Sequence, residues 1–186
     1  SKYAVAVSNC TAALHLSLMA LEIGKDDEVI IPDLTFVADA NAVLACNAKP
    51  VVADINKENF FLSISNVKKN ITKKTKAIIP VHIYGQVCNI DEILDLAKDH
   101  NLKVVEDCAH AVGTFHKSKH VGTLGNTGCF SFYPTKNITT AEGGMVTTNS
   151  KEIAEKVRQL RSHGMTKSLK SRYSSEYPWV FDIVEP

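Results

Sequence analysis

A single lysine lies in a segment that could carry out covalent chemistry. Residues Gly128–Gly144 read GCFSFYPTKNITTAEGG, which is an apolar strand followed by Pro134, Lys136 and a Glu-Gly-Gly turn. A lysine that is desolvated in a pocket loses its proton more easily and attacks a carbonyl carbon as the neutral amine. Taken alone, Lys136 fits an ordinary surface lysine better, so the neighbouring motifs decide its role.

A carboxylate and a histidine follow a second apolar strand. The strand Lys103–Glu106 has Val104 and Val105 at its centre, and Asp107 and His110 come after it. A carboxylate at the end of a buried strand is costly unless a cation or hydrogen bonds stabilise it. A cationic ring nitrogen would meet this need, and so would a helix that Asp107 caps. The residues alone leave both interpretations open.

A third candidate is the helix start after the first strand. The segment Ser8-Asn9-Cys10-Thr11-Ala12 follows the strand Tyr3–Val7 and opens a helix. Unpaired N–H groups and the positive end of the helix dipole meet at such a start, which suits a phosphate group. An ordinary N-cap by Ser8 or Asn9 is the alternative, and it is the commoner case for such a segment taken alone.

Other patterns argue against several kinds of site. Gly122, Gly125 and Gly128 are spaced G-x-x-G-x-x-G, which fits neither the dinucleotide fingerprint nor a P-loop, and we interpret them as loop glycines. The 7 histidines form no metal-binding spacing, so we expect no metal site. The 5 cysteines include no C-x-x-C pair, and we expect reduced thiols that pack as small hydrophobic groups.

The segments that must position these residues alternate between strands and helices. We predict helices over Thr11–Ile23, Phe36–Cys46 and Asn89–His100, the last capped by Asn89, and a further helix capped by Ser150. We predict strands over Tyr3–Val7, Glu28–Ile31, Pro50–Ala53, Lys76–Val81, Lys103–Glu106, Phe130–Phe132 and Met145–Thr148. A polar connection runs around Ser63–Thr75, and Lys167–Pro186 reads as an excursion without a clear period. The alternation predicts βαβ units and a mostly parallel sheet, with ligands at its carboxyl edge.

The composition narrows the class of protein. The 186 residues are 45% hydrophobic and 22% charged, as expected for one globular domain. The 21 basic and 20 acidic residues leave a net charge of +1, which gives no basic excess for nucleic-acid binding. No apolar stretch is long enough to cross a bilayer, and Ser1-Lys2-Tyr3 does not begin a signal peptide. We therefore expect a cytoplasmic protein without a membrane partner.

Several motifs, in order along the chain, closely resemble the DegT/DnrJ/EryC1/StrS family of pyridoxal-phosphate (PLP)-dependent sugar aminotransferases. They are Ser8–His15, Pro32–Phe36, Pro80–Gly85, Glu106–Ala111 and Phe130–Asn137. The resemblance runs from about Tyr3 to the end of the chain. It implies the aspartate-aminotransferase-like (type I) α/β fold, whose large domain is a mainly parallel seven-stranded sheet between helices. The elements predicted above fit this fold.

The resemblance implies the roles of the reacting residues. Lys136 matches the lysine that holds PLP as a Schiff base and then moves protons as acid and base. Asp107 matches the carboxylate that faces the pyridine nitrogen and keeps it protonated, so that the ring remains an electron sink. His110 matches a position beside the ring, near its phenolic oxygen.

The resemblance also implies how the cofactor is held. Thr11 and Ala12 match residues that bind the phosphate through their amides and the Thr hydroxyl, and Ser131 reaches the same phosphate. Phe36 matches the aromatic residue that stacks on the ring. Cys10 replaces a glycine that is common at this position in the family, so the turn here can differ.

The reaction and the partners follow from the same resemblance. An amino acid, glutamate in this family, donates the amino group, and a keto-sugar on a nucleotide diphosphate accepts it. Family members are homodimers and are longer than this chain, with helices before the first strand and a smaller C-terminal domain. We therefore expect residues 1–186 to be most of the PLP-binding large domain, truncated at both ends.

Two other classes compete with this interpretation. The chain could be an inactive or regulatory form of the fold that acts only by interaction, although intact Lys136 and Asp107 argue against it. It could also be a nicotinamide-dependent enzyme on a related sheet, although the G-x-G-x-x-G motif is missing.

Overall fold

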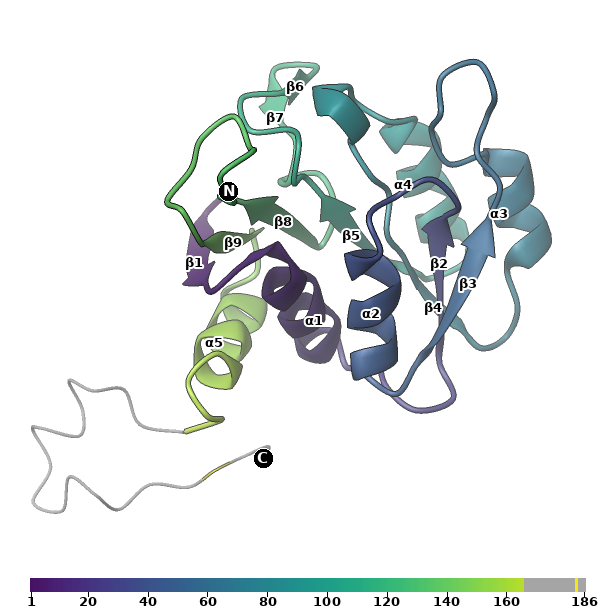
Figure 1. Ribbon diagram of the computed structural model, residues 1–186. Helices are drawn as coiled ribbons and strands as arrows, with labels where there is room; N and C mark the ends of the chain where they lie inside the picture. Colours follow the sequence, from purple (N-terminus) through teal and green to yellow (C-terminus); the bar gives the residue numbers. More distant parts are fainter. Residues whose placement is uncertain (166–182, 184–186) are drawn as a thin grey trace, which may run out of the picture.

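A seven-stranded sheet runs through the molecule in the order β1-β9-β8-β5-β4-β2-β3 (Figure 1). The computed structural model describes residues 1–165 and residue 183, so the excursion predicted over Lys167–Pro186 lies outside the described residues except for Ile183. The strands are β1 (Tyr3–Val7), β2 (Glu28–Pro32), β3 (Lys49–Ala53), β4 (Thr75–Ile78), β5 (Lys103–Asp107), β8 (Thr127–Ser131) and β9 (Gly144–Thr148). The strands β8, β5, β4, β2 and β3 are parallel, and β9 is antiparallel to its neighbours β1 and β8. The predicted mainly parallel α/β sheet is confirmed.

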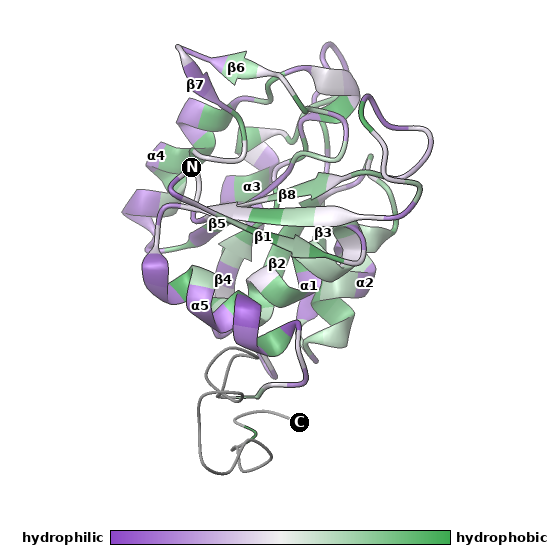
Figure 2. Cartoon of the chain, turned by 90° about the vertical axis from the view of Figure 1, so that its left-hand side faces the viewer, coloured by the Kyte–Doolittle hydropathy of each residue, from purple (hydrophilic) through white to green (hydrophobic). Residues whose placement is uncertain are grey.

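Helices cover both faces of the sheet (Figure 1). The helices α1 (Cys10–Ala20), α2 (Ala38–Ala45) and α5 (Lys151–Leu160) lie on one face, and α3 (Ile64–Asn70) and α4 (Ile90–Asp99) lie on the other. Figure 2 shows that α5 turns a hydrophilic face outward, as expected for a helix that buries Ala154 and Val157. None of the helices in the described part of the chain is long and apolar enough to span a bilayer.

Alternation along the strands divides the core between the two faces. Val29 and Ile31 belong to the apolar cluster of α1 and α2, whereas Ile30 between them belongs to the cluster of α3 and α4. Because both faces of the sheet are buried, successive residues of a strand are all apolar. This explains why the central strands lack polar alternation in the sequence.

The same alternation decides which side chains meet at the carboxyl edge. Val105 lies on the α1 face, so Asp107 two residues later lies there too, while Glu106 points to the opposite face. Cys129 is the register partner of Asp107 in β8 and belongs to the α1 cluster. Ser131, two residues beyond Cys129, therefore shares this face. Asp107 and Ser131 thus lie on the side of the sheet where α1 begins.

The local predictions were mostly confirmed, with identifiable exceptions. Helix α3 forms within the stretch Ser63–Thr75 that we predicted as a connection, and the strand predicted over Phe130–Phe132 is Thr127–Ser131. Asn89 precedes α4, but its side chain makes no capping hydrogen bond. Ser150 does cap α5, since its hydroxyl accepts a hydrogen bond from the Ile153 amide at 3.2 Å. The hairpin of β6 (Phe115–His116) and β7 (Lys119–His120) was not predicted.

Close backbone contact explains the evenly spaced glycines. Gly128 lies within β8 and not in a loop as predicted, and a Cβ atom on it would lie 2.2 Å from the Gly122 Cα. A Cβ atom on Gly122 would lie 2.5 Å from the Phe130 ring, and a Cβ atom on Gly125 would lie 2.7 Å from the Val104 carbonyl oxygen. The glycine spacing therefore allows residues 122–125 to pack directly on β8 and β5.

We expect Gly128→Ala to lower the free energy of unfolding by about 1–3 kcal/mol, as overpacking does in a tight core. The atoms in the way are backbone atoms of Gly122, which cannot move aside as a flexible side chain would. Urea denaturation measures the effect, with Gly24→Ala as the matched control, because a Cβ there meets only the Cys46 carbonyl oxygen at 4.0 Å. Equal stability of the two variants would contradict this explanation.

Candidate active site

The start of α1 is a capped helix N-terminus at the carboxyl edge. The Asn9 side chain accepts a hydrogen bond from the Ala12 amide at 2.8 Å, so Asn9 is the cap. The start of β9 lies against this turn, because a Cβ atom on Gly144 would lie 2.4 Å from the Asn9 carbonyl carbon. With the Ala12 amide engaged, the exposed Thr11 offers the amide and hydroxyl that an anion can reach without displacing Asn9.

Asp107 is the buried carboxylate at the end of β5. Its backbone is held by hydrogen bonds to Pro80 and His82, and the residue is only 6% exposed. Oδ1 accepts the Ala109 amide at 2.8 Å and lies 4.0 Å from the Cys10 Sγ, whereas Oδ2 has no hydrogen bond among the described residues. Burial raises the pKa of Asp107, and the Ala109 amide partly offsets this rise. The carboxylate is therefore placed to gain from a cation.

Lys136 lies in the loop that joins β8 to β9. The loop is braced across its base, since the Phe132 amide donates to the Gly143 carbonyl at 2.9 Å and the Thr140 amide donates to the Phe132 carbonyl at 3.0 Å. A turn brings the Lys136 amide to 2.9 Å from the Tyr133 carbonyl oxygen. These bonds fix the backbone around Lys136, whose side chain is half-buried.

Lys136, Asp107 and His110 share one electrostatic environment. Burial, followed by the Lys136 ammonium, lowers the pKa of His110, and the Asp107 charge opposes both. The same ammonium and His110 help to hold down the pKa of Asp107, which burial raises. The ammonium also acts on the Cys10 thiol at the start of α1. The fold thus brings Lys136 into the same environment as Cys10, which lies about 125 positions earlier in the chain.

Ser131 and Phe36 lie at the same edge of the sheet. Ser131 is buried at the end of β8, and its hydroxyl accepts the Tyr133 amide at 3.4 Å. Phe36 lies between β2 and α2 and is 75% exposed. An exposed aromatic ring at this edge suits stacking on a planar ligand. The roles of both residues, and of Thr11 and Ala12, stay predictions.

A second buried carboxyl group lies in the same environment and was not predicted. Asp39, in the first turn of α2, is fully buried; its Oδ2 accepts the Thr35 hydroxyl, and its Oδ1 has no partner among the described residues. Burial, followed by the Asp107 charge, raises the pKa of Asp39 well above its ordinary value, which favours the uncharged acid. The sequence did contain a signal, because Asp39 lies on the same helical stripe as Ala42 and Val43.

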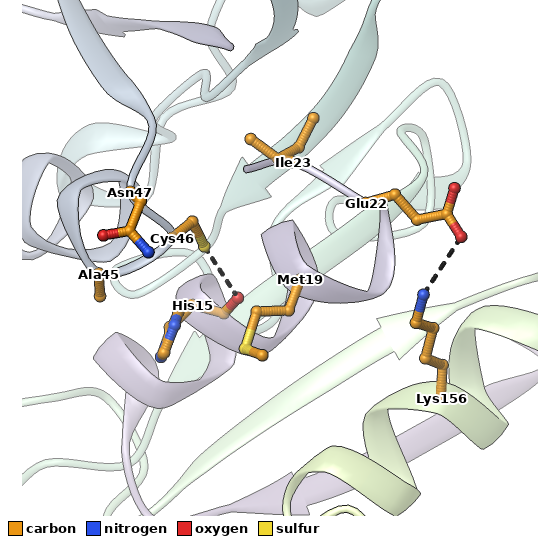
Figure 3. Close-up of a pocket in the computed structure, with 8 residues that line it drawn as sticks. All are labelled: His15, Met19, Glu22, Ile23, Ala45, Cys46, Asn47 and Lys156. Atoms are coloured by element: carbon orange, nitrogen blue, oxygen red, sulfur yellow. Dashed lines mark hydrogen bonds and ion pairs between the residues drawn. The ribbon is translucent and has the colours of Figure 1, made fainter. Parts of the chain in front are cut away.

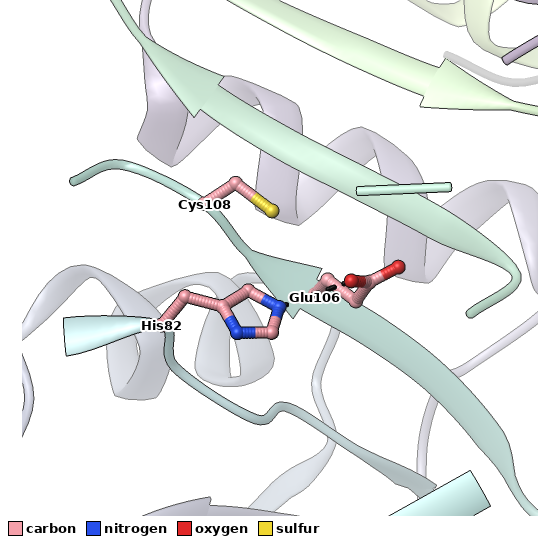
Figure 4. A group of neighbouring side chains, drawn as sticks. All are labelled: His82, Glu106 and Cys108. Carbon is pink, nitrogen blue, oxygen red and sulfur yellow. Dashed lines mark hydrogen bonds and ion pairs between the residues drawn. The ribbon is translucent and has the colours of Figure 1, made fainter. Parts of the chain in front are cut away.

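A trio of possible metal ligands lies on the other face of β5. His82, Glu106 and Cys108 are buried, with ligand atoms within 4.8 Å of one another (Figure 4). The side-chain donors and acceptors of His82 and Glu106 are already engaged, however. His82 Nδ1 accepts the Cys88 amide at 3.3 Å, so the ring carries its proton on Nε2 and donates it to Glu106 Oε2 at 3.0 Å. Burial raises the pKa of Cys108 well above its ordinary value, so it stays a thiol.

Glu106 accepts three backbone amides besides the His82 bond. These donors, at 2.7–2.8 Å, are the amides of Gly122, Leu124 and Gly125. Both carboxylate oxygens are therefore saturated, and a metal ion would have to displace existing bonds. The network is structural: it fastens residues 122–125 and the segment after β4 to β5.

Two surface hollows lie away from the carboxyl edge. One, of about 390 Å³, is lined by the second half of α1, the end of α2 and Lys156 of α5, as Figure 3 shows. Glu22 and Lys156 form an ion pair of 3.2 Å across it. The other, of about 540 Å³, lies where β2, β4 and β5 begin. Neither hollow contains a residue of the site described above.

A mainly parallel sheet with a lysine, a carboxylate and a helix start at its carboxyl edge is the arrangement that the resemblance to type I PLP-binding folds predicts. The chain belongs to the DegT/DnrJ/EryC1/StrS aminotransferase family, which matches residues 1–181. This family match confirms the resemblance seen in the sequence.

Individual relatives agree with this assignment. The chain is 51% identical over 164 residues to GDP-perosamine synthase from Caulobacter vibrioides, covering 88% of this chain and 44% of that protein. Its structure is similar to an aminotransferase from Psychrobacter cryohalolentis, with a TM-score of 0.91, 39% identity, and coverage of 100% of this chain and 47% of that one. It is also similar to the PLP-form of Spr1654 from Streptococcus pneumoniae, with a TM-score of 0.85, 33% identity, and coverage of 98% and 50%. The chain spans about half the length of these relatives, and PLP is the family's cofactor, as predicted.

Proposed function

We propose that the protein is a PLP-dependent aminotransferase that transfers an amino group from glutamate to a keto-sugar carried on a nucleotide diphosphate. In this proposal, residues 1–186 are the PLP-binding large domain. The family match and the likeness to GDP-perosamine synthase support the reaction and the class of acceptor. The observation that carries the proposal is the shared environment of Lys136, Asp107 and His110 at the carboxyl edge.

The residues at this edge fit PLP. A protonated ring nitrogen suits Asp107 Oδ2, which lacks a partner among the described residues, and its charge would offset the effect of burial. The phosphate suits the start of α1, where Thr11 offers an amide and a hydroxyl and Ser131 shares the face of the sheet. The Ala12 amide can join them once the Asn9 side chain turns away.

The chain's own residues then have distinct tasks. PLP supplies an electron sink when bound, and Lys136 Nζ binds it and, as the released amine, holds and moves the proton. The Asp107 carboxylate keeps the ring nitrogen protonated. His110 donates from Nε2, because its Nδ1 accepts the Tyr84 amide at 3.3 Å. The Phe36 ring packs on the cofactor plane.

A homodimer is the functional form in this proposal. Apolar side chains at the carboxyl edge are 39–75% exposed, namely Leu34, Phe36, Val37, Tyr133 and Ile138. Apolar surface gathered next to a ligand site is characteristic of an interface. A second copy that covers this edge would also exclude water from Lys136.

A turnover assay tests the proposed function. The full-length protein, supplied with PLP, glutamate and nucleotide-linked keto-sugars, is expected to form 2-oxoglutarate and an amino-sugar nucleotide in equal amounts. PLP binding without turnover on any such sugar would favour a regulatory protein. Binding of NAD without binding of PLP would favour a nicotinamide enzyme.

A further inference from the structure

A strained tyrosine stands next to His110. Tyr84 lies in the turn Ile83–Gly85 with φ 53° and ψ 25°, in the left-handed region that bulky residues rarely adopt. Gly85 follows with a φ of 80°. Such strain persists only where the surroundings hold it, and it is concentrated at functional sites.

The turn is fastened at both ends. His82, just before it, is buried and bonded to Glu106 at 3.0 Å. The Gly85 carbonyl accepts the Thr114 hydroxyl at 2.9 Å. A Cβ atom on Gly85 would lie 3.2 Å from the His110 carbonyl oxygen, so the turn lies directly against the His110 backbone. These contacts hold Tyr84 over His110.

Tyr84 contacts His110 in two ways. Its main-chain amide donates to His110 Nδ1 at 3.3 Å. Its ring stacks on the imidazole, with centroids 5.8 Å apart and an interplanar angle of 9°. Because Nδ1 accepts a hydrogen bond, the proton of the neutral ring is on Nε2. Burial, followed by the Lys136 ammonium, lowers the pKa of His110, which favours this neutral form.

We propose that Tyr84 is a positioning residue for His110. Its amide fixes the tautomer with the proton on Nε2, and its ring fixes the imidazole plane, so that Nε2 is the donor offered to the phenolic oxygen of the cofactor. The identity of that oxygen rests on the proposed function, whereas the tautomer rests on the contacts alone. Tyr84 acts through His110 and is not itself a catalytic residue.

Nitrogen-15 NMR of histidine-labelled protein, at neutral pH and without PLP, reads the tautomer directly. The His110 signals are assigned with His110→Gln. We expect a protonated Nε2 and an unprotonated Nδ1 in the unaltered protein and in Tyr84→Phe, which keeps the stacked ring. In Tyr84→Ala the strain stays and the stacking that holds the turn over the imidazole is lost, so we expect the turn to relax and the main-chain amide to leave Nδ1. The ratio of Nε2–H to Nδ1–H should then fall about fivefold or more. A proton on Nδ1 in the unaltered protein, or unchanged signals in Tyr84→Ala, would overturn the proposal.

Two further variants keep the test decisive. Glycine adopts the left-handed conformation without strain, so Tyr84→Gly should keep the proton on Nε2 of His110. Because the stacking is lost, kcat should fall about fivefold. A changed tautomer in this variant would also overturn the proposal. Phe115→Ala is the matched control, because it removes an exposed aromatic ring outside the site. The centroid of this ring lies 5.0 Å from that of the His120 ring. It should leave the His110 signals unchanged. If no variant and no unaltered protein transfers amino groups, the proposed function fails, and the NMR result still decides the role of Tyr84.

Discussion

Lys136→Ala is expected to abolish covalent attachment of PLP and to lower turnover about 10⁴-fold. The change removes the amine that binds the cofactor and the group that moves the proton, and a positioned acid–base group alone contributes up to about 10⁴-fold. Borohydride reduction of the loaded protein, followed by peptide mass mapping, is expected to find the phosphopyridoxyl adduct on Lys136 in the unaltered protein. The visible absorbance of lysine-bound PLP should disappear in the variant.

Two control variants separate the amine from its charge. Lys136→Arg keeps a cation near Asp107, but a guanidinium does not lose its proton, so this variant should also form no adduct. Lys119→Ala removes an exposed lysine of β7 and should leave both adduct and turnover unchanged. An adduct that maps to a different lysine would remove the basis of the proposed site.

The strands, and the location of the candidate site at the carboxyl edge of the sheet, could be predicted from the sequence for one physical reason. Strands buried on both faces need apolar residues at successive positions, so a polar residue such as Asp107 is conspicuous where a strand ends. The rule that ligands bind at the carboxyl ends of parallel strands then placed Asp107 and the start of α1 at one edge. The sheet order and the electrostatic effect of Lys136 on the pKa of Asp107 agree with that reasoning.

What the sequence did not reveal depends on partners distant in the chain. Glu106 sits in a valine-rich strand and is stabilised by His82 and by amides of residues 122–125, none of which local periodicity can identify. Helix α3 was missed because it is short, and Val67 is its only fully buried residue. The positive φ of Tyr84 follows from contacts on both sides of its turn and not from a glycine at that position.

Glu106→Ala is expected to lower the free energy of unfolding by about 3–5 kcal/mol, as does breaking a buried charged network. The change leaves His82 Nε2–H and the amides of Gly122, Leu124 and Gly125 without the acceptor that the fully buried Glu106 supplies. Total stabilities of about 5–15 kcal/mol make this a large fraction. Urea denaturation measures the loss. Glu155→Ala is the control, since its exposed pair with Lys151 is worth at most about 0.5 kcal/mol.

The pH dependence distinguishes a charged network from simple packing. Burial by itself raises the pKa of Glu106, but the hydrogen bonds from His82 and from the Gly125 and Gly122 amides outweigh it, so the pKa lies below its ordinary value of 4.5. A carboxylate with a lowered pKa in the folded protein stabilises the fold fully at any pH above its pKa in the unfolded chain. This stabilisation is lost as the pH falls through the pKa of the folded protein.

Glu106→Gln keeps an acceptor for two of the amides but turns an NH₂ donor toward the other two donors. This variant should therefore be less stable than the unaltered protein at neutral pH. The difference between the two should shrink as the pH falls below about 4.5. A constant difference over this range would show that Glu106 is not held as a carboxylate.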